Sequence, residues 1–396
     1  MEKSELPTGY RYAGIASGIK KSGKADLGLI LSDVPANCAG VFTQNRVVAA
    51  PLHVTKHRIA QGKCQAILVN SGNANACTGE AGLQVAEGCA ALAAEALGIS
   101  PDLVAVASTG VIGQLLSIEP FIAKMPELVA SLEVLGANGV AAAMMTTDRF
   151  AKISSLSSEI SGQVYHILGV AKGAGMIHPN MATMLGFVMT DAGLESDQLQ
   201  RLLGTAVDNS FNAITVDGDT STNDMVLLMA NGAAGVSIEP GSTEEARFAE
   251  NLQQVLLDLA KMIVRDGEGA TKLAEIKVCG AENSAQAKCV AKAVATSSLV
   301  KTAFFGEDAN WGRIIAAVGY AGVDVDPDKI DIMFDGVMVA RAGLYVGEHA
   351  EKPATAVLKK PEFCVTINLN HGNGSASYYT SDLTYDYVKI NADYRS

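Results

Sequence analysis

The sequence of 396 residues lacks the features that would place it in several common classes of protein. It has no run of about 18 apolar residues that could span a membrane, and its first residues lack the apolar segment of a signal peptide. Its 30 basic residues are outnumbered by 42 acidic ones, which gives a formal net charge of -12, and no basic cluster stands out. Because such a chain would repel a polyanion, we do not expect it to bind nucleic acid. The missing apolar segments lead us to expect a cytoplasmic protein that does not bind membranes.

The cysteines and histidines also lack the spacings of metal sites and redox motifs. The seven cysteines are odd in number, scattered and without a C-x-x-C pair, which is typical of reduced and mostly buried thiols. His53 and His57 are four residues apart, but no carboxylate lies between them at the position that an H-E-x-x-H motif requires. The sequence therefore predicts no metal site.

What the chain does contain is typical of a compact α/β enzyme. Hydrophobic residues make up 48%, charged residues only 18%, and there are 39 glycines. A chain of this length exceeds one ordinary core, so we expect two or more domains or one duplicated layered unit.

Short β-rich runs alternate with helical stretches, which favours mixed α/β layers. We expect strands at residues 28–32, 39–43, 65–70, 103–109, 184–192, 275–280, 329–336, 337–344 and 362–370, and a strand-rich region over 155–175. We expect helices over residues 83–98, 195–211 and 242–269. The last of these opens with a serine or threonine cap and early glutamates, which suit the positive end of a helix dipole.

One threonine in the segment GMIHPNMATMLGF, residues 175–187, raises a chemical question. Thr183 lies at the start of a predicted buried strand with no evident histidine and carboxylate to activate it. A threonine hydroxyl is almost never ionised at neutral pH, so a nucleophilic threonine needs a base within hydrogen-bond reach. If the hydroxyl attacks the carbonyl of Ala182, an N-to-O acyl shift and hydrolysis leave Thr183 with a free α-amine. An α-amine has an ordinary pKa of about 7.7 to 8.0, so it can accept the hydroxyl proton.

The residues around Thr183 are compatible with such a cut. Gly173 and Gly175 permit unusual backbone conformations, Pro179 fixes one dihedral angle, and the small Ala182 leaves its carbonyl accessible. The alternative interpretation is that Thr183 is simply a β-branched residue at the start of a strand. From the spacing alone, this simpler interpretation is the favoured one.

The segment KGAGMIHPNMATML resembles the self-cleavage segment of the ornithine acetyltransferase (glutamate N-acetyltransferase) family, whose nucleophile is the threonine of Met-Ala-Thr-Met-Leu. Further strings occur in the family's order, namely NSGNANACTG at 70–79, STGVIG at 108–113, MTTD at 145–148, RDGEGATK at 265–272 and the terminal YVKINADYRS. Six strings spread along the whole chain form a highly specific match, and the chain is identified as a member of this family.

The resemblance implies a role for each matching position. Thr183 would be both the cleavage-site residue after Ala182 and the nucleophile that accepts the acetyl group. Thr109 and Gly110 would form the oxyanion hole, because a hydroxyl and a backbone N–H can donate to the negative oxygen of an acyl-transfer intermediate. The implied substrate contacts are Thr146, Lys172, Thr183, Glu268, Asn391 and Ser396. A fixed cation and a fixed anion suit a substrate that carries a carboxylate and an ammonium, although the residue types leave open which charge meets which group.

Three positions call for separate comment. His178 could be mistaken for the catalytic base, but the family mechanism uses no base there. Arg149 follows the MTTD string where a smaller polar residue is expected, and Ser396 ends the chain where threonine is usual. Serine keeps the hydroxyl group, so that substitution hardly affects the implied contact.

Two other strings do not support the functions that they suggest. DGDTSTND at 217–224 is acidic, but an EF-hand loop would need glycine and glutamate where Thr222 and Leu228 stand. We expect it to form a polar turn near the site. The glycines at 14–28 lack the order and the strand-to-helix context of a dinucleotide or phosphate loop.

The resemblance implies a ping-pong transfer of acetyl from N2-acetylornithine to glutamate through an acetyl-Thr183 ester, within cyclic arginine biosynthesis and without a metal or organic cofactor. The mature protein would consist of residues 1–182 and 183–396, assembled as a heterotetramer of two α and two β chains. The implied fold is a layered α/β sandwich of the N-terminal-nucleophile kind, resembling self-processing aminopeptidases, with a second smaller α/β domain. A bifunctional form would also take acetyl from acetyl-CoA. No residue separates the two forms, and of the two we favour the monofunctional one.

Two other functions remain open from the sequence. A self-processing amidase or aminopeptidase would share the cut but pass its acyl group to water. A noncatalytic amino-acid-binding or regulatory protein would not be cut at all.

Overall fold

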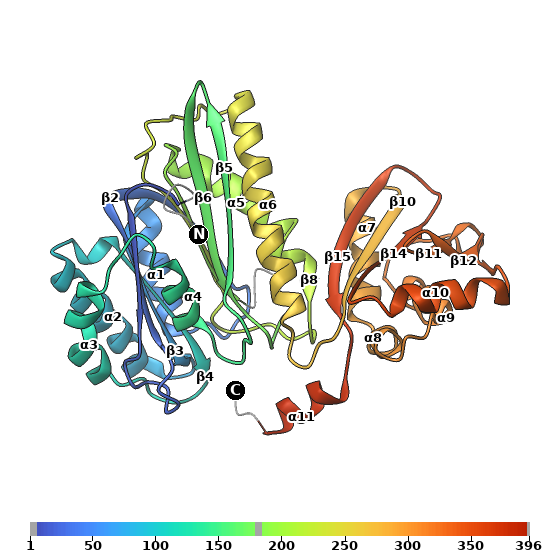
Figure 1. Ribbon diagram of the computed structural model, residues 1–396, viewed down its shortest axis with the longest axis horizontal. Coiled ribbons are helices and arrows are strands. Elements are labelled where there is room, and N and C mark those ends of the chain that lie inside the picture. Colours follow the sequence, from blue (N-terminus) through green and yellow to red (C-terminus); the bar gives the residue numbers. More distant parts are fainter. Residues whose placement is uncertain (1–5, 179–183, 394–396) are drawn as a thin grey trace.

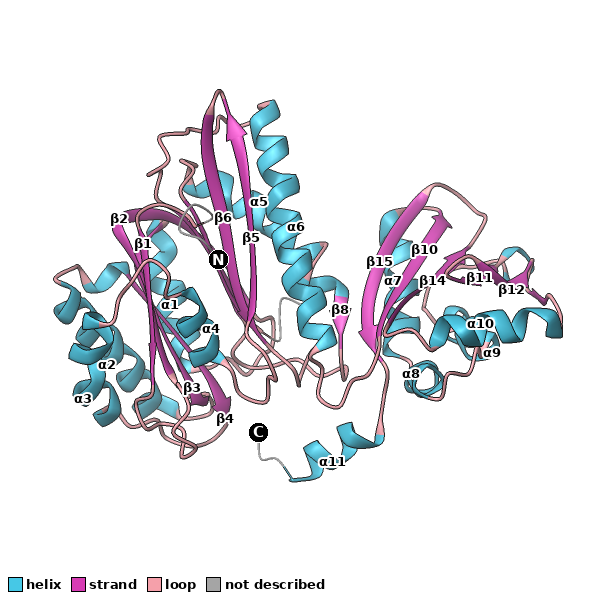
Figure 2. Cartoon of the chain, viewed as in Figure 1, coloured by secondary structure: helices cyan, strands magenta, loops and turns pink. Residues whose placement is uncertain are grey.

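The computed structural model of the protein describes residues 6–178 and 184–393. The predicted cleavage residues Ala182 and Thr183 and the predicted contact Ser396 lie outside the described residues. The described chain forms two mixed α/β units, a larger one on an eight-stranded sheet and a smaller one on a seven-stranded sheet (Figure 1). Helices flank the strands in both units (Figure 2). This is the layered α/β architecture with a smaller second unit that the sequence predicts.

The larger sheet interleaves strands from both halves of the chain. Its order is β4-β3-β2-β9-β7-β6-β5, and β1 pairs with β2 beside this path. The strands are β1 (Tyr10–Ile15), β2 (Leu27–Phe42), β3 (Lys63–Asn73), β4 (Val104–Val111), β5 (Lys152–Ile160), β6 (Gln163–Lys172), β7 (Leu185–Thr190) and β9 (Met225–Ala230). Because β7 and β9 lie between β2 and β6, a break between residues 182 and 183 would leave the two pieces joined by hydrogen-bonded ladders.

Helices cover both faces of the larger sheet. They are α1 (Ala50–Arg58), α2 (Gly79–Leu97), α3 (Glu119–Ala130), α4 (Ala137–Met144), α5 (Ser196–Asp208) and α6 (Thr243–Arg265). Successive side chains of a strand point to opposite faces. In β9, Val226 and Leu228 therefore join the core shared with α5 and α6, whereas Leu227 and Met229 join the core shared with α4. This double burial explains why the central strands are continuous apolar runs.

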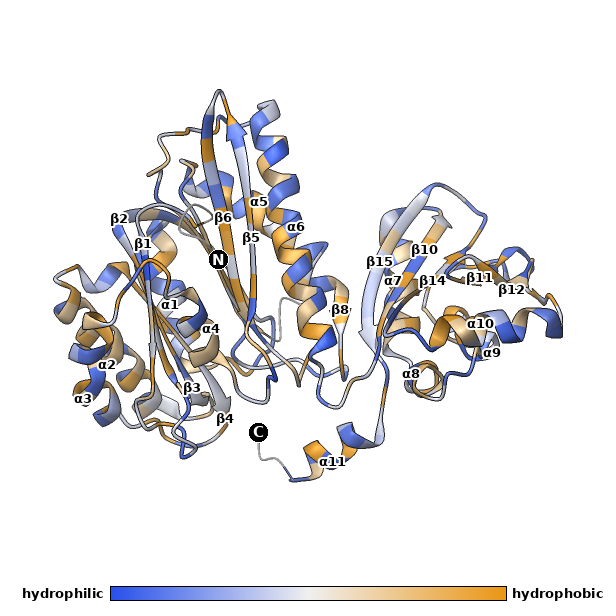
Figure 3. Cartoon of the chain, in the orientation of Figure 1, coloured by the Kyte–Doolittle hydropathy of each residue, from blue (hydrophilic) through white to orange (hydrophobic). Residues whose placement is uncertain are grey.

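Helix α6 shows how local sequence produces an element of this unit. Ser242 caps it by accepting a hydrogen bond from the backbone N–H of Glu245, as predicted for a serine cap. Its apolar side chains recur at helical spacing and are buried against the sheet, and in Figure 3 it carries both apolar and hydrophilic stretches. The helix ends at Arg265, and the chain after it enters the candidate site.

The smaller sheet has the order β13-β12-β11-β14-β10-β15-β8. Its strands are β8 (Ile214–Thr215), β10 (Leu273–Ala281), β11 (Asp331–Phe334), β12 (Val337–Arg341), β13 (Leu344–Tyr345), β14 (Glu362–Asn368) and β15 (Gly374–Ser381). The later helices are α7 (Ser284–Thr296), α8 (Ser298–Phe305), α9 (Trp311–Gly319), α10 (Glu351–Leu358) and α11 (Tyr385–Asp393). After β15 the chain leaves this unit, and α11 runs back beneath the gap between the two units in Figure 1.

Short 3-10 turns complete the described secondary structure. They are Ile59–Gln61, Pro101–Leu103, Phe211–Ala213, Pro327–Lys329 and Glu348–Ala350. Among the described helices, none combines the length and apolarity needed to cross a bilayer.

Two expectations from the sequence need correction. The runs at 28–32 and 39–43 belong to one strand, β2, whose register shifts between Leu31 and Ala36, so that the intervening Pro35 lies at an irregularity. The prediction of mostly buried cysteines is wrong. All seven are free, but only Cys38, Cys64 and Cys89 are buried.

Candidate active site

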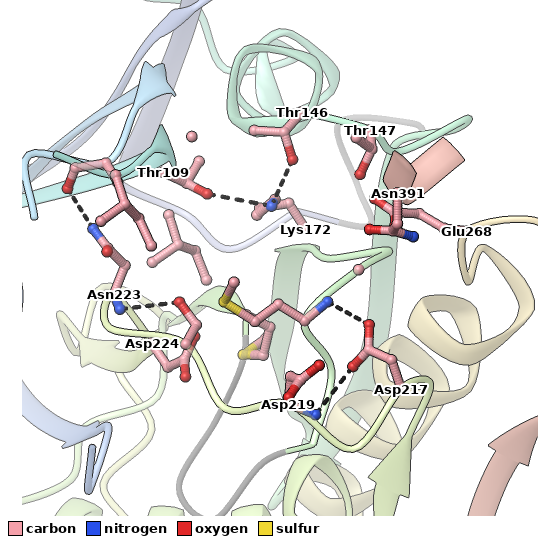
Figure 4. A pocket seen from close by; sticks show the side chains of 18 of the residues that line it. Thr109, Thr146, Thr147, Lys172, Asp217, Asp219, Asn223, Asp224, Glu268 and Asn391 are labelled. Atoms are coloured by element: carbon pink, nitrogen blue, oxygen red, sulfur yellow. Dashed lines mark hydrogen bonds between the residues drawn. The ribbon is translucent and has the colours of Figure 1, made fainter. Parts of the chain in front are cut away.

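A cavity of about 210 Å³ collects most of the predicted site residues (Figure 4). It is lined by the carboxyl ends of β4 and β6, the loop after α4, the turn before β9, the segment after α6, and α11. Pockets for drug-sized ligands are typically about 300–1,000 Å³, so this cavity suits a smaller molecule. Six predicted positions line it: Thr109, Gly110, Thr146, Lys172, Glu268 and Asn391.

Lys172 links two of the predicted hydroxyl groups. It is the last residue of β6 and is buried, and its Nζ donates to Thr146 Oγ1 at 2.9 Å and to Thr109 Oγ1 at 3.3 Å. Figure 4 shows both contacts. Because Thr109 accepts from the lysine, its hydroxyl proton remains available for donation to a ligand, whereas the Thr146 hydroxyl also donates to Asp148 Oδ2 at 3.5 Å.

The charge of Lys172 is held in place by a buried carboxylate. Asp148 Oδ2 lies 3.9 Å from Lys172 Nζ, and the same carboxylate accepts from the backbone N–H groups of Thr146 at 2.9 Å and Gly173 at 2.7 Å. Burial would raise the pKa of Asp148, but the charges of Lys172 and Lys152 outweigh it and hold the pKa well below its usual range. Burial lowers the pKa of Lys172, and Asp148 opposes that shift.

A second lysine extends this group of charges away from the cavity. The side chain of Lys152 is fully buried and bridges Asp148 Oδ1 at 2.8 Å and Asp266 Oδ2 at 2.5 Å. Arg149, the position where a smaller residue was expected, is 58% exposed and places its Nε 3.0 Å from Asp266 Oδ1. Arg149, which departs from the family pattern, therefore forms a partly exposed ion pair with Asp266 behind the site.

The conformation of Gly110 requires glycine. Its φ of +133° lies in a region that side chains disfavour, and a Cβ at this position would lie 2.4 Å from the carbonyl carbon of Gly72 on β3. Neither backbone can move cheaply, because the two strands are paired at this register. Gly110 therefore brings its strand end against β3 while it lines the cavity beside Thr109. The oxyanion role of this pair remains a prediction.

Glu268 and Asn391 form the opposite side of the cavity in Figure 4. Asn391 Nδ2 donates to Glu268 Oε2 at 2.9 Å, which ties α11 to the segment after α6. A Cβ on Gly175 would lie 2.5 Å from the Glu268 carboxylate, so the glycine of the GMIHPNMATMLGF segment makes room for this acid. The backbone N–H of Glu268 also donates to the carbonyl of Ala174 at 3.0 Å.

The DGDTSTND string forms a polar turn at the cavity, as expected. Its Asp217 accepts from the backbone N–H groups of Met176 at 2.6 Å and Ile177 at 2.7 Å. It thereby holds Met176, which has a φ of +59°, in an unusual conformation. The cavity-lining members of the string are Asp217, Asp219, Ser221, Asn223 and Asp224. Within residues 6–178 and 184–393, no three His, Cys, Asp or Glu side chains are grouped to hold a metal ion.

His178 does not line the cavity. Its Nδ1 lies 3.2 Å from Thr215 Oγ1, and its carbonyl accepts from Thr220 Oγ1 at 2.9 Å. Burial lowers its pKa to about 4, an effect to which the charge of Lys292 contributes. The imidazole is therefore neutral at neutral pH.

Sequence reasoning did not identify two carboxyl groups that shape this site, Asp148 and Asp266, and it placed Asp224 only within an expected polar turn near the site. Asp148 and Asp266 stand inside the MTTD and RDGEGATK strings, so their presence in those strings was a usable signal. Lys152, which joins them, carries no comparable signal, because it is an ordinary lysine at the start of a strand.

Sequence comparisons find similar proteins over nearly the whole length of this chain. The sequence profile of the ArgJ family matches residues 11–396. The arginine biosynthesis bifunctional proteins ArgJ of Syntrophotalea carbinolica and Geobacter sulfurreducens are 61% and 54% identical over 389 residues, which cover 98% of this chain and 99% of each relative. A crystal structure of the arginine biosynthesis bifunctional protein ArgJ from Bacillus halodurans is 47% identical, with a TM-score of 0.51. It covers 52% of this chain and 98% of the crystallised chain.

Proposed function

The chain belongs to the ArgJ family, and from this premise we propose that its cavity transfers acetyl from N2-acetylornithine to glutamate. The protein is accordingly an acetyltransferase of arginine biosynthesis. The observation that carries the proposal is the meeting of six predicted positions, far apart in sequence, in the wall of one cavity. The proposal has Thr183 as the nucleophile, with its own α-amine as the base after self-cleavage.

The first step would be attack of the Thr183 hydroxyl on the acetyl carbonyl of acetylornithine, with the α-amine taking the hydroxyl proton. Negative charge develops on the carbonyl oxygen, and the Thr109 hydroxyl and the Gly110 N–H would donate to it. Lys172 supports this role because its ammonium donates to Thr109 Oγ1 and so leaves the threonine proton free. Each such donor is typically worth about 3 to 4 kcal/mol of transition-state stabilisation.

The charges of the cavity support a proposal for substrate orientation. Among the described residues, no lysine or arginine lies within ion-pair distance of Glu268, whose carboxylate accepts a hydrogen bond from the neutral side chain of Asn391. The ornithine ammonium therefore fits at Glu268. Lys172 is a cation in the wall of the same cavity, and it suits the substrate carboxylate together with the Thr146 hydroxyl.

Self-cleavage before Thr183 would give chains of 182 and 214 residues from the 396. The crystallised relative from Bacillus halodurans supports this proposal, because it is matched over 98% of its length and yet spans only 52% of this chain, as one of two pieces would. The ladders of β7 and β9 would keep both pieces in one sheet. We further propose that two such pairs assemble as a cytoplasmic heterotetramer and that the chain's own groups suffice, without a metal or organic cofactor.

The relatives favour the bifunctional form over the monofunctional form that the sequence alone suggested. The proteins from Syntrophotalea carbinolica and Geobacter sulfurreducens are both named as bifunctional. We therefore propose that this chain also acetylates glutamate from acetyl-CoA, with the acetyl group passing through the same Thr183 ester. Assays with each donor and glutamate, run in parallel, test this extension separately from the main proposal.

A denaturing gel combined with an activity assay tests the proposed function. The purified protein should show two bands and should convert acetylornithine and glutamate to ornithine and acetylglutamate. Thr183→Ala should give one full-length, inactive band, whereas Thr183→Ser keeps a hydroxyl and should still be cut. Consumption of acetylornithine without glutamate would favour the amidase function instead. An intact, uncut and active protein would refute the proposal.

A further inference from the structure

One buried carboxyl oxygen at the cavity has no assigned partner. Within the described part of the chain, three buried side-chain polar atoms lack a hydrogen-bond partner: Tyr12 Oη, Ser158 Oγ and Asp224 Oδ2. Of these three residues, Asp224 alone lines the cavity, and it is only 2% exposed. Buried polar atoms are nearly always satisfied, so an unsatisfied one in the wall of an active site calls for an explanation, and a catalytic role is one such explanation.

The rest of the Asp224 side chain is firmly held. Its carboxyl group interacts with Ser221 and with the backbone N–H of Met184, the amide that joins Met184 to Thr183 in the chain. Asp224 directly precedes β9, whose first residue donates its N–H to the carbonyl of Met184 at 3.1 Å. The unsatisfied oxygen thus lies beside the strand that follows the predicted nucleophile. In Figure 4 Asp224 lies across the cavity from Glu268 and Asn391.

Asp224 and Asp148 are both buried near Lys172, but they have opposite electrostatic environments. Burial raises the pKa of Asp224 well above its usual range, and the charge of Lys172 only partly opposes this shift. Among the described residues, no basic side chain lies within ion-pair distance of Asp224, whereas Asp148 pairs with Lys152 at 2.8 Å. Of the two acids, Asp224 is therefore the one whose surroundings favour the protonated form, whereas Asp148 stays ionised. Such divergence between neighbouring acids is how active sites separate acid and base roles.

We propose that Asp224 is a catalytic residue that stores a proton between the two halves of the acetyl-transfer cycle. The inference rests on the proposed function. When the acetyl C–N bond of acetylornithine breaks, the α-amine of Thr183 returns the hydroxyl proton to the leaving nitrogen, which gives neutral ornithine. Asp224 then donates its own proton, so that ornithine leaves as an ammonium ion and the side chain becomes a carboxylate.

The second half of the cycle reverses this transfer. Glutamate arrives as an ammonium ion, which cannot attack an ester. The Asp224 carboxylate takes one proton from it, and the resulting amine attacks the acetyl carbon of the Thr183 ester. The C–O bond breaks, the spare amine proton returns to the threonine oxygen through the α-amine, and acetylglutamate forms. Asp224 is again protonated, so atoms and charges balance over the full cycle.

Asp224→Asn tests the proposal, because asparagine matches the shape of the protonated acid but cannot exchange a proton. The variant should lose about 10² to 10⁴-fold in kcat/KM for glutamate at pH 7, as is usual on removal of a general acid–base. Its remaining activity should rise about tenfold per pH unit up to the pKa of the glutamate amine, because the acceptor must then arrive deprotonated. The wild-type value should change much less over the same range.

Hydroxylamine provides a rescue experiment that a purely structural role would not predict. Its nitrogen is already deprotonated at neutral pH, so the acetylated form of Asp224→Asn should pass its acetyl group to hydroxylamine at close to the wild-type rate in the second half-reaction. Asp217→Asn is the matched control. It alters a neighbouring cavity carboxylate that accepts backbone N–H groups at 2.6 and 2.7 Å. Any loss in this control should be the same with both acceptors and at every pH.

The other ionisable groups of the cavity limit how a pH profile is interpreted. They are Lys172, Asp217, Asp219, Glu268 and Tyr387. A profile of Asp224→Asn that parallels the wild type, or an equal loss with hydroxylamine, would overturn the proposal and assign the proton to one of these groups.

If the variant fails to fold, the pH profile of the wild-type protein tests the proposal by itself. A kcat/KM for glutamate that rises tenfold per pH unit in the unmodified protein would exclude a resident proton store. Unmodified protein that makes no acetylglutamate would refute the proposed function instead.

Discussion

The ammonium of Lys152 lies 2.8 Å from the carboxylate of Asp148, and both side chains are completely buried. This ion pair lies directly behind Lys172 and Thr146, because Asp148 also contacts both of them. The candidate substrate contacts therefore depend on an ion network that no substrate reaches. Its consequences for stability and activity can be tested separately.

Lys152→Met should destabilise the protein strongly. The substitution would leave the carboxylates of Asp148 and Asp266 buried without their shared cation, and breaking such a pair typically costs about 3 to 5 kcal/mol. Denaturant titration of the free energy of unfolding measures this loss. Lys359→Met, at an exposed lysine, is the control and should change stability by less than about 0.5 kcal/mol. Equal effects of the two substitutions would contradict the assigned role of Lys152.

The protein should lose stability as the pH falls from about 6.5 to about 4, partly because of His178. Burial lowers the pKa of this imidazole to about 4 from an ordinary value of 6.5, so between these values the unfolded chain binds the proton more tightly than the folded protein. His178→Asn should therefore weaken the pH dependence of the melting temperature within this window and leave it unchanged above pH 7. An unaltered slope in the variant would show that other groups cause the acid sensitivity.

Glu268→Gln should weaken the binding of acetylornithine while leaving the fold intact. Glutamine keeps the shape and can still pair with Asn391, whose Nδ2 lies 2.9 Å from Glu268 Oε2, but it removes the negative charge. A hydrogen bond to a charged group is worth about 1.5 to 3 kcal/mol, so kcat/KM for acetylornithine should fall by roughly 10 to 150-fold. Steady-state kinetics measure the fall, and Glu282→Gln at an exposed position is the matched control. Unchanged kinetics would remove Glu268 from the substrate site.

Gly110→Ala should abolish most activity by displacing the strand end. The new Cβ would lie 2.4 Å from a backbone carbon of Gly72, at a φ of +133° that alanine disfavours. If the N–H of Gly110 donates to the oxyanion, loss of this geometry should lower kcat by about 10² to 10³-fold. Gly204→Ala in α5 is the opposite case. Nothing lies within 4 Å of its added Cβ, so it should stabilise the helix by about 0.5 to 1 kcal/mol without loss of activity.

Elements with a strong local pattern were predictable from the sequence. Helix α6 carries both a serine cap and an apolar stripe, and its predicted range of 242–269 contains the observed Thr243–Arg265. Strand β9 was not predicted, because a short, wholly apolar run has no period that separates a buried strand from a helix. Helix α11 was missed for a different reason. It is only nine residues long and none of them is buried, so it lacks the core-facing apolar stripe that marks a longer packed helix.

By itself, the sequence determined the family and the candidate site positions, because short motifs in a fixed order can be matched without any knowledge of contacts. The tertiary structure decided which of these positions meet. Lys152 joins Asp148 and Asp266 only because the end of α6 packs beside the start of β5, and no local pattern encodes a contact between residues 114 positions apart. It also decided that Asp224 is buried with no cation at ion-pair distance among the described residues, while Asp148 has two. The protonation state of a carboxyl group depends on the solvent and charges around it, and those are set by packing.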